Sequence, residues 1–294
     1  MKSQTYDSRS TRLGGCYLVY MAVNAPEAAF DQTEFTNAVL KNAFELWFDP
    51  EIGRRQAAGL LPTPFAVWAA QVLLEVGEPA EIFFNDQIRG IFKAQIPPDF
   101  QAPIERGAQI SLADMGEIVG MELTIEQPNA SHLTAVLHKQ TWYLLFDFRY
   151  NATRVARHLS VAREFLSAAE AAYSAKHYNV AVDNLFAAVE LAAKSHLLML
   201  PDERFLTSTR HGFVATRFNL HGGKHGNVDP IFVSLFNELT NEWTAARYPD
   251  EPLRVGASKI GEWLKTARVM LDDLDQKRPR RRSEGAGSIV SANP

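Results

Sequence analysis

The sequence has almost no cysteine. Cys16 is the single one in 294 residues. One thiol excludes a disulfide within the chain and a zinc site built from several cysteines. The segment around Cys16 has the composition of a strand, so we expect a buried structural thiol.

An excess of positive charge and long apolar runs are also lacking. The net charge is −4, so no overall basic field attracts nucleic acid, and any contact of that kind has to be local. No run approaches the roughly 18–20 apolar residues of a membrane span. Residues 1–14 are polar and lack the apolar core of a signal peptide. We therefore expect a cytoplasmic protein without membrane contact.

Motifs for familiar chemistry are absent as well. The sequence contains no Walker or Rossmann glycine pattern and no Gly-x-Ser-x-Gly context for a nucleophilic serine. Two loop histidines, His221 and His225, could join His211 at a metal, but loop histidines of this kind are usually only solvated, so we expect neither a metal nor a cofactor.

The chain divides into two halves of different texture. Residues 15–150 hold short segments broken by proline, glycine and asparagine. Their patterns predict strands over 17–23, 81–84, 117–126, 133–138 and 141–148, and a helix over 31–47 capped by Asp31. Residues 65–74 fit a strand or a buried helix equally well. The last three strands resemble an antiparallel meander, so this half is an α+β domain with a mainly antiparallel sheet.

The second half, residues 151–275, is alanine-rich with helical periodicity. It predicts helices over 152–175, 179–199, 209–220, 228–247 and 254–273. Gly222 and Gly223 are expected to end the third helix, and Asp229 with Pro230 to begin the fourth. Residues 276–294 lack apolar periodicity and are expected to be a disordered basic tail.

Several segments of the helical half resemble the HEPN family. In the first two helices they are Ala162-Arg163-Glu164-Phe165-Leu166, Tyr178-Asn179-Val180-Ala181-Val182-Asp183-Asn184 and Ala188-Val189-Glu190-Leu191-Ala192-Ala193-Lys194. Further along they are Thr209-Arg210-His211-Gly212-Phe213, Phe218, Gly226-Asn227-Val228, Phe236-Asn237 and Ala245-Ala246-Arg247-Tyr248. The resemblance covers about 110–120 residues and implies an all-α bundle that usually dimerises.

Many HEPN proteins are ribonucleases of toxin–antitoxin and phage-defence systems, and the active ones carry Arg-x4–6-His near the fourth helix. Here Trp243 stands where that arginine is expected and Arg247 where the histidine is expected. Arg204 and His211 do have the spacing, with six residues between them, but they lie between the second and third helices. They are the catalytic candidates that the resemblance leaves.

Other basic residues are candidates for contact with phosphate or nucleic acid: Arg210, Lys224, His225, Arg247, Lys277, Arg278 and Arg280. The cluster from Lys277 to Arg282 could bind a nucleic-acid backbone or could only keep the tail soluble. In the same way, His211 could simply pack at the third helix while Arg204 is solvated.

The function expected from this pattern is binding of RNA, a nucleotide or a protein partner by a HEPN-like protein in a toxin–antitoxin or defence-type setting. The expected assembly is a homodimer, because Phe213, Phe218 and Phe232 offer more aromatic surface than a small bundle needs. The N-terminal domain is expected to supply recognition of a partner. An active ribonuclease and a structural adaptor without a nucleic-acid role remain the alternatives.

Overall fold

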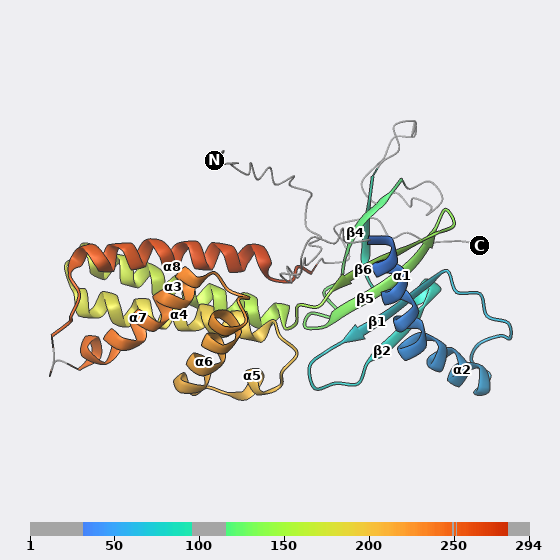
Figure 1. The fold of residues 1–294 in the computed structure, drawn as a ribbon, viewed down its shortest axis with the longest axis horizontal. Helices are drawn as coiled ribbons and strands as arrows, with labels where there is room; N and C mark the ends of the chain where they lie inside the picture. The colour runs from blue at the N-terminus through green and yellow to red at the C-terminus, as the bar shows by residue number, and fades with distance from the viewer. Residues whose placement is uncertain (1–31, 96–115, 249, 251, 282–294) are drawn as a thin grey trace, which may run out of the picture.

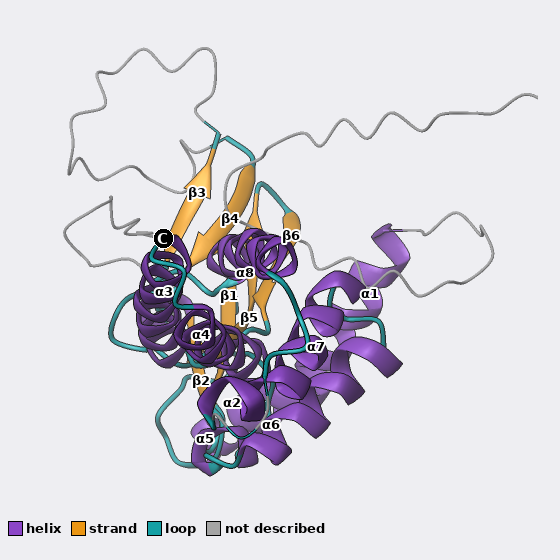
Figure 2. Ribbon diagram, turned by 90° about the vertical axis from the view of Figure 1, so that its left-hand side faces the viewer, coloured by secondary structure: helices purple, strands orange, loops and turns teal. Residues whose placement is uncertain are grey.

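The computed structural model describes residues 32–95, 116–248, 250 and 252–281. The predicted strand over 17–23, Cys16, the helix cap at Asp31 and most of the predicted tail lie outside these residues. Figure 1 shows a sheet-containing half and an elongated helical half lying end to end. Figure 2 looks along the helical half, with the strands behind it. The predicted order, an α+β region followed by an all-helical one, is confirmed.

The first half contains an antiparallel four-stranded sheet in the order β2-β1-β5-β6. Its strands are β1 (Ala69–Leu74), β2 (Glu81–Phe84), β5 (Ser131–His138) and β6 (Thr141–Asp147). Residues 65–74, which the sequence left open, therefore end in a strand. The β5–β6 hairpin is the predicted one, and its turn residues Lys139 and Gln140 both have positive φ, as a two-residue hairpin turn requires.

One part of the predicted meander is wrong. Strand β4 (Ile118–Glu122) does not continue into the β5–β6 sheet but pairs with β3 (Ile91–Ala94), a strand that the sequence did not predict. The alternating pattern of β4 marks a strand but not its partner. The pair covers one face of the main sheet, where Ile118, Met121 and Leu123 pack with Leu73 and Leu145.

Helices cover the other face of the sheet. They are α1 (Gln32–Ala43), a π-helical turn η1 (Phe44–Phe48) and α2 (Asp49–Ala57), so the helical segment runs ten residues beyond the predicted end at 47. Ala43 and Phe48 pack on Val72, Phe84 and Leu133. Successive side chains of β1 point to opposite faces of the sheet. Ala70 and Val72 therefore pack in this core, and Ala69 and Leu73 pack in the core on the other face.

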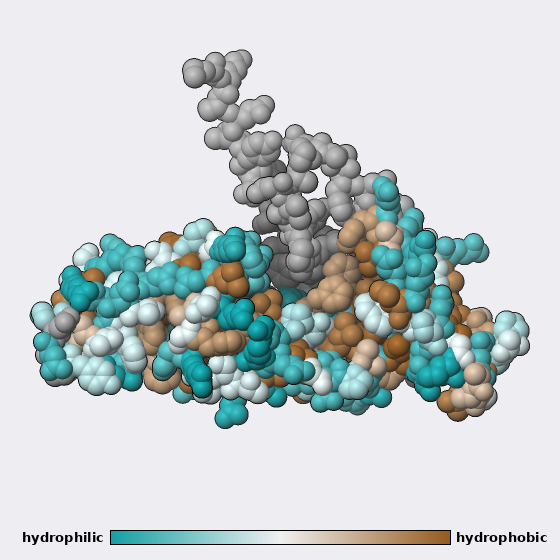
Figure 3. All heavy atoms as spheres, turned by 60° about the horizontal axis from the view of Figure 1, so that its bottom comes forward, coloured by the Kyte–Doolittle hydropathy of each residue, from teal (hydrophilic) through white to brown (hydrophobic). Residues whose placement is uncertain are grey.

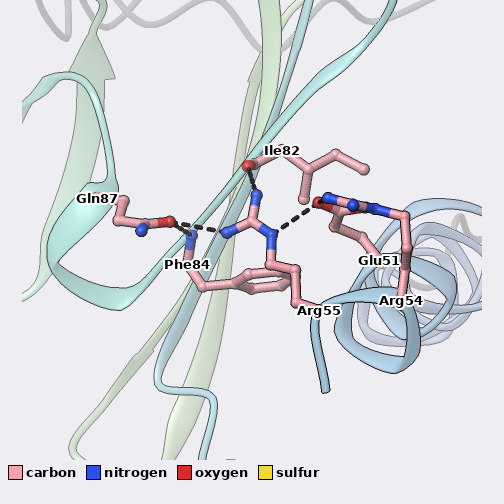
Figure 4. A network of polar contacts seen from close by, with 6 residues as sticks. All are labelled: Glu51, Arg54, Arg55, Ile82, Phe84 and Gln87. Atoms are coloured by element: carbon pink, nitrogen blue, oxygen red, sulfur yellow. Dashed lines mark hydrogen bonds and ion pairs between the residues drawn. The ribbon is translucent and has the colours of Figure 1, made fainter. Parts of the chain in front are cut away.

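Helix α2 is held to the sheet by an arginine network (Figure 4). Arg55 donates to the carbonyl of Ile82 at 2.7 Å and to the side chain of Gln87, which follows in the short 3-10 turn η2 (Asn85–Gln87). Hydrogen bonds from Arg54, and then from Arg55, lower the pKa of the Glu51 carboxyl to about 2. The network therefore fixes the end of α2 on β2.

The helical half is built on α3 (Ala152–Ser174) and α4 (Tyr178–Leu198), both close to their predicted bounds. The other elements are α5 (Arg204–Thr207), α6 (His211–Phe218), the π-helical turn η4 (Asn219–Lys224), α7 (Pro230–Arg247) and α8 (Ala257–Lys277). The start of α7 is as predicted, since the Asp229 carboxylate accepts from the backbone N–H of Ile231 at 2.9 Å.

Two helix ends differ from the predictions. Helical structure continues through Gly222, which is buried, and a Cβ at that position would meet Val233 at 2.8 Å and Val228 at 3.0 Å. This glycine therefore serves close packing instead of a helix stop. Helix α8 extends to Lys277, so the segment expected to be disordered from residue 276 begins inside a helix.

The aromatic residues from which a dimer was predicted are largely buried in the structure. Phe218 and Phe232 are buried in the core of the bundle and Phe213 packs against it, so they offer little free apolar surface. On the face shown in Figure 3, the helical half presents mainly polar residues, and apolar ones gather over the α+β half. None of the described helices is long and apolar enough to cross a membrane.

Candidate functional site

Polar side chains interrupt the buried face of α4 at regular intervals. Asp183, Glu190 and Lys194, with Phe186 between them, are spaced by three or four residues and therefore lie along one side of the helix. This side faces the start of α6 and the last turns of α7. Each polar group has a partner on one of these helices or on the loop before α6, and together they form one connected cluster.

The first part of the cluster joins α4 to α7. The indole N–H of Trp243 donates to Asp183 Oδ1 at 2.9 Å. Arg247 binds the same carboxylate through Nε and Nη2, at 3.1 and 3.2 Å, and its guanidinium carbon lies 4.9 Å from the centre of the Trp243 ring. Trp243 and Arg247, the two fourth-helix residues that depart from the family pattern, therefore bind the same carboxylate, that of Asp183.

The second part places His211 against this group. The ring of His211 lies 5.5 Å from that of Trp243 and 6.1 Å from that of Phe186, and Phe186 lies 5.0 Å from Trp243. Nδ1 of His211 is bound to the Glu190 carboxylate. The His211 side chain is 60% exposed, so its other ring nitrogen, Nε2, is left for a ligand.

Lys194 anchors the loop that leads into α6. Its ammonium group donates to the carbonyl of Ser208 at 2.6 Å. Burial lowers the pKa of Lys194, and the nearby Glu190 opposes that shift. Since Ser208 and His211 are three residues apart, Lys194 and Glu190 fix both ends of the segment that carries the histidine.

The two predicted catalytic residues have different partners in the structure. Arg204, at the start of α5, is exposed and bound to Asp202 through three hydrogen bonds between 2.5 and 3.1 Å. No contact joins Arg204 to His211 within the described chain. The partners of His211 come from α4 and α7. Arg210 is exposed beside His211 at the start of α6.

The remaining predicted residues lie at the ends of η4 and α8. Lys224 and His225 are exposed at the end of η4, at the far end of α6 from His211. Lys277 and Arg278 lie at the end of α8, paired with Asp273 and Asp275. Arg280 is exposed beyond them.

Sequence reasoning missed Asp183, Phe186, Glu190 and Lys194 as site residues. The available signal was the recurrence of acids and a lysine on the otherwise apolar face of α4. In the parts of the chain that are described, no group of three or more His, Cys, Asp or Glu side chains could hold a metal ion.

Comparison with known proteins identifies the helical half. The model of the HEPN domain family matches residues 155–277. No curated protein and no solved structure matches the chain. The match begins in α3, ends with α8 and includes every residue of the cluster. A match to this family indicates an RNA-related or nuclease-like function in general. The helical half of this chain, over residues 155–277, is similar to HEPN domains.

Proposed function

We propose that the protein binds single-stranded RNA through the α4–α7 cluster, defined as Asp183, Phe186, Glu190, His211, Trp243 and Arg247. The observation that carries the proposal is the partly buried ring of Trp243, which has an exposed imidazole, that of His211, and an exposed guanidinium, that of Arg247, as close neighbours. A base can stack on an aromatic ring while basic groups bind the phosphates beside it, which is how single strands are commonly bound.

The charges of the cluster suit local binding in an acidic protein. Asp183 occupies Nε and Nη2 of Arg247 and leaves Nη1 as an outward donor. Glu190 is bound to His211, and Arg210 adds an exposed positive charge next to it. The two acids therefore orient the basic groups, and Nη1 of Arg247 and the Arg210 side chain are left as donors and cations, as phosphate requires.

The geometry favours binding over cleavage. Cleavage by attack of the ribose 2′-hydroxyl needs a base and a charge-stabilising group that converge on one phosphate. Here Arg247 is held by Asp183, and it meets His211 only through the intervening Trp243 ring. We therefore propose a HEPN protein that acts on RNA by binding, without metal-independent cleavage.

A second candidate function, an endoribonuclease, is favoured by one observation. The Glu190 carboxylate holds Nδ1 of His211, and a histidine oriented in this way can accept a proton at Nε2. The wider setting, toxin–antitoxin or phage defence with a homodimer and partner recognition by the α+β half, is proposed from the family resemblance alone.

Binding is tested by fluorescence anisotropy with a labelled 12-nucleotide single-stranded RNA at 50 and 200 mM salt. Loss of one base stack costs about 1–3 kcal/mol, so Trp243→Ala should weaken binding roughly 5- to 150-fold. Arg247→Ala should weaken it and reduce its salt dependence. Arg268→Ala, which breaks an exposed ion pair with Glu170 between α8 and α3, is the matched control and should leave affinity within about twofold.

The same samples discriminate the alternatives. Circular dichroism confirms that each variant is folded. If the wild-type protein binds no RNA, the alternative of a structural adaptor without a nucleic-acid role is favoured. If Trp243→Ala and Arg268→Ala bind RNA with equal affinity, the α4–α7 cluster is excluded as the binding site. RNA cleavage that disappears in His211→Ala would replace binding by the endoribonuclease.

A further inference from the structure

The chain that follows α8 returns to the α+β half and inserts an arginine there. Arg281 donates from Nε to the carbonyl of Gln127 at 3.2 Å and from Nη2 to the carbonyl of Ala130. Its third nitrogen, Nη1, donates to the carbonyl of Arg280 at 2.9 Å. Every nitrogen of the guanidinium thus meets a backbone oxygen, and two of these oxygens belong to the turn between β4 and β5.

Carboxylates close to this turn support a buried cation. Asp147 at the end of β6 and Glu122 at the end of β4 both favour the charged form of Arg281, whereas Arg149 opposes it. Burial lowers the pKa of Arg281 to about 10, so the side chain remains protonated at neutral pH. Glu122 also pairs with Lys93, and Asp147 with Arg149, so the surroundings are balanced and not simply acidic.

A second arginine crosses the same junction in the opposite direction. Arg149, which follows β6, binds Asp147 through Nε and Nη2 at 2.7 and 2.8 Å and donates from Nη1 to the carbonyl of Lys277. That carbonyl is in the last turn of α8, where helix carbonyls lack partners and a cation is favoured. The short linker adds Asn151, whose backbone N–H donates to the carbonyl of Asn129 and whose side chain donates to the carbonyl of Leu198.

We propose that the turn from Gln127 to Ala130 forms a guanidinium-binding site on the α+β half, and that Arg281 is its built-in ligand, which fastens the HEPN-like domain to that half. The proposal does not depend on RNA binding. It assigns to Arg281 a role different from the exposed Arg280, although both belong to the same basic segment.

The site should discriminate guanidinium from ammonium. The carbonyls of Gln127 and Ala130 bind different nitrogens of one planar group, which a guanidinium presents in a fixed fork. A lysine ammonium is a single point with tetrahedral donors and cannot reproduce that spacing. Arg281→Lys should therefore keep the positive charge and still lose most of the stabilisation.

The test is thermal unfolding of full-length variants, followed by chemical rescue. Arg281→Ala leaves two backbone carbonyls without their donors, and we expect the Tm to fall by roughly 3–8 °C. Arg281→Lys should fall by nearly as much, and Arg280→Ala, the matched control, by less than about 1 °C. Millimolar methylguanidinium should restore part of the lost Tm in Arg281→Ala in a saturable way, and methylammonium at the same concentration should not.

The proposal is overturned if Arg281→Ala melts like Arg280→Ala. It is also overturned if Arg281→Lys retains the wild-type Tm, or if the two cations act alike on Arg281→Ala. Wild-type protein under the same additions gives the non-specific effect of each salt, which is subtracted.

Discussion

At pH 5 the free energy of unfolding should be about 4 kcal/mol lower than at pH 8. His132 and His196 should each contribute about 2 kcal/mol to this difference. Burial lowers the pKa of His132 to about 4 and that of His196 to about 3. In the unfolded chain both titrate near 6.5. Below that pH the unfolded state binds protons that the folded state does not, so stability is complete above pH 6.5 and falls as the pH drops.

The side chain of His132 and the Nε2 atom of His196 are buried in different halves of the protein. His132 lies between the sheets, with Nδ1 at 3.1 Å from the hydroxyl of Thr134, and the nearby Asp147 only partly offsets its burial. His196 lies in α4, its ring 5.0 Å from that of His221, and its Nε2 is buried without a hydrogen-bond partner. Protonation of His196 would add a charge beside His221 and Lys277, which already lower its pKa.

Urea denaturation at pH 5, 6, 7 and 8 measures this effect. His196→Leu should remove about half of the pH dependence, because the leucine needs no proton and no partner. His177→Asn, at an exposed histidine before α4, should leave the dependence unchanged. A free energy of unfolding that stays constant from pH 8 to pH 5 would show that these histidines are not neutral in the folded protein.

Phe218→Ala should lower the free energy of unfolding by about 3–5 kcal/mol. Phe218, the last residue of α6, is 0% exposed, and its ring lies 5.3 Å from that of Phe236 and 6.1 Å from that of His196. It therefore fills the space where α4, α6 and α7 meet. Removal of the ring leaves a cavity that close helix packing cannot fully collapse.

Denaturation at pH 7.5 gives the value, and Phe165→Ala is the control. Phe165 is an exposed ring on α3, so its loss should change the free energy of unfolding by about 0.5 kcal/mol or less. Equal effects of the two substitutions would mean that α6 is not packed as described.

The helical half could be predicted well because each helix carries its own periodic signal. The bounds of α3 and α4, and the start of α7 at Asp229 and Pro230, follow from local patterns. The pairing of β4 with β3 could not be predicted in the same way, because alternation assigns a face to each residue and leaves the partner strand open. Gly222 was wrongly predicted to end a helix. A glycine is needed there for close packing against Val233 of α7, a contact that no local pattern reveals.

The site was predictable only in part, because its contacts join residues that lie on different helices. His211 and Arg247 were identified singly from family spacing. Their relation depends on Asp183 and Glu190, which reach them from another helix across 64 and 21 positions of sequence. Arg204 was included on spacing alone and binds its neighbour Asp202 instead. Arg281 carried no local signal that distinguished it from the other arginines of the basic segment.

The most direct test of the central claim is photo-cross-linking of a 4-thiouridine-labelled single-stranded RNA to the full-length protein, followed by mass spectrometry of the linked peptides. The account predicts cross-links within the α4–α7 cluster, on the peptides that contain His211 and Trp243, and their loss when unlabelled RNA competes. Competed cross-links confined to the α+β half or to the segment from Lys277 to Arg281, with none on α6 or α7, would contradict it.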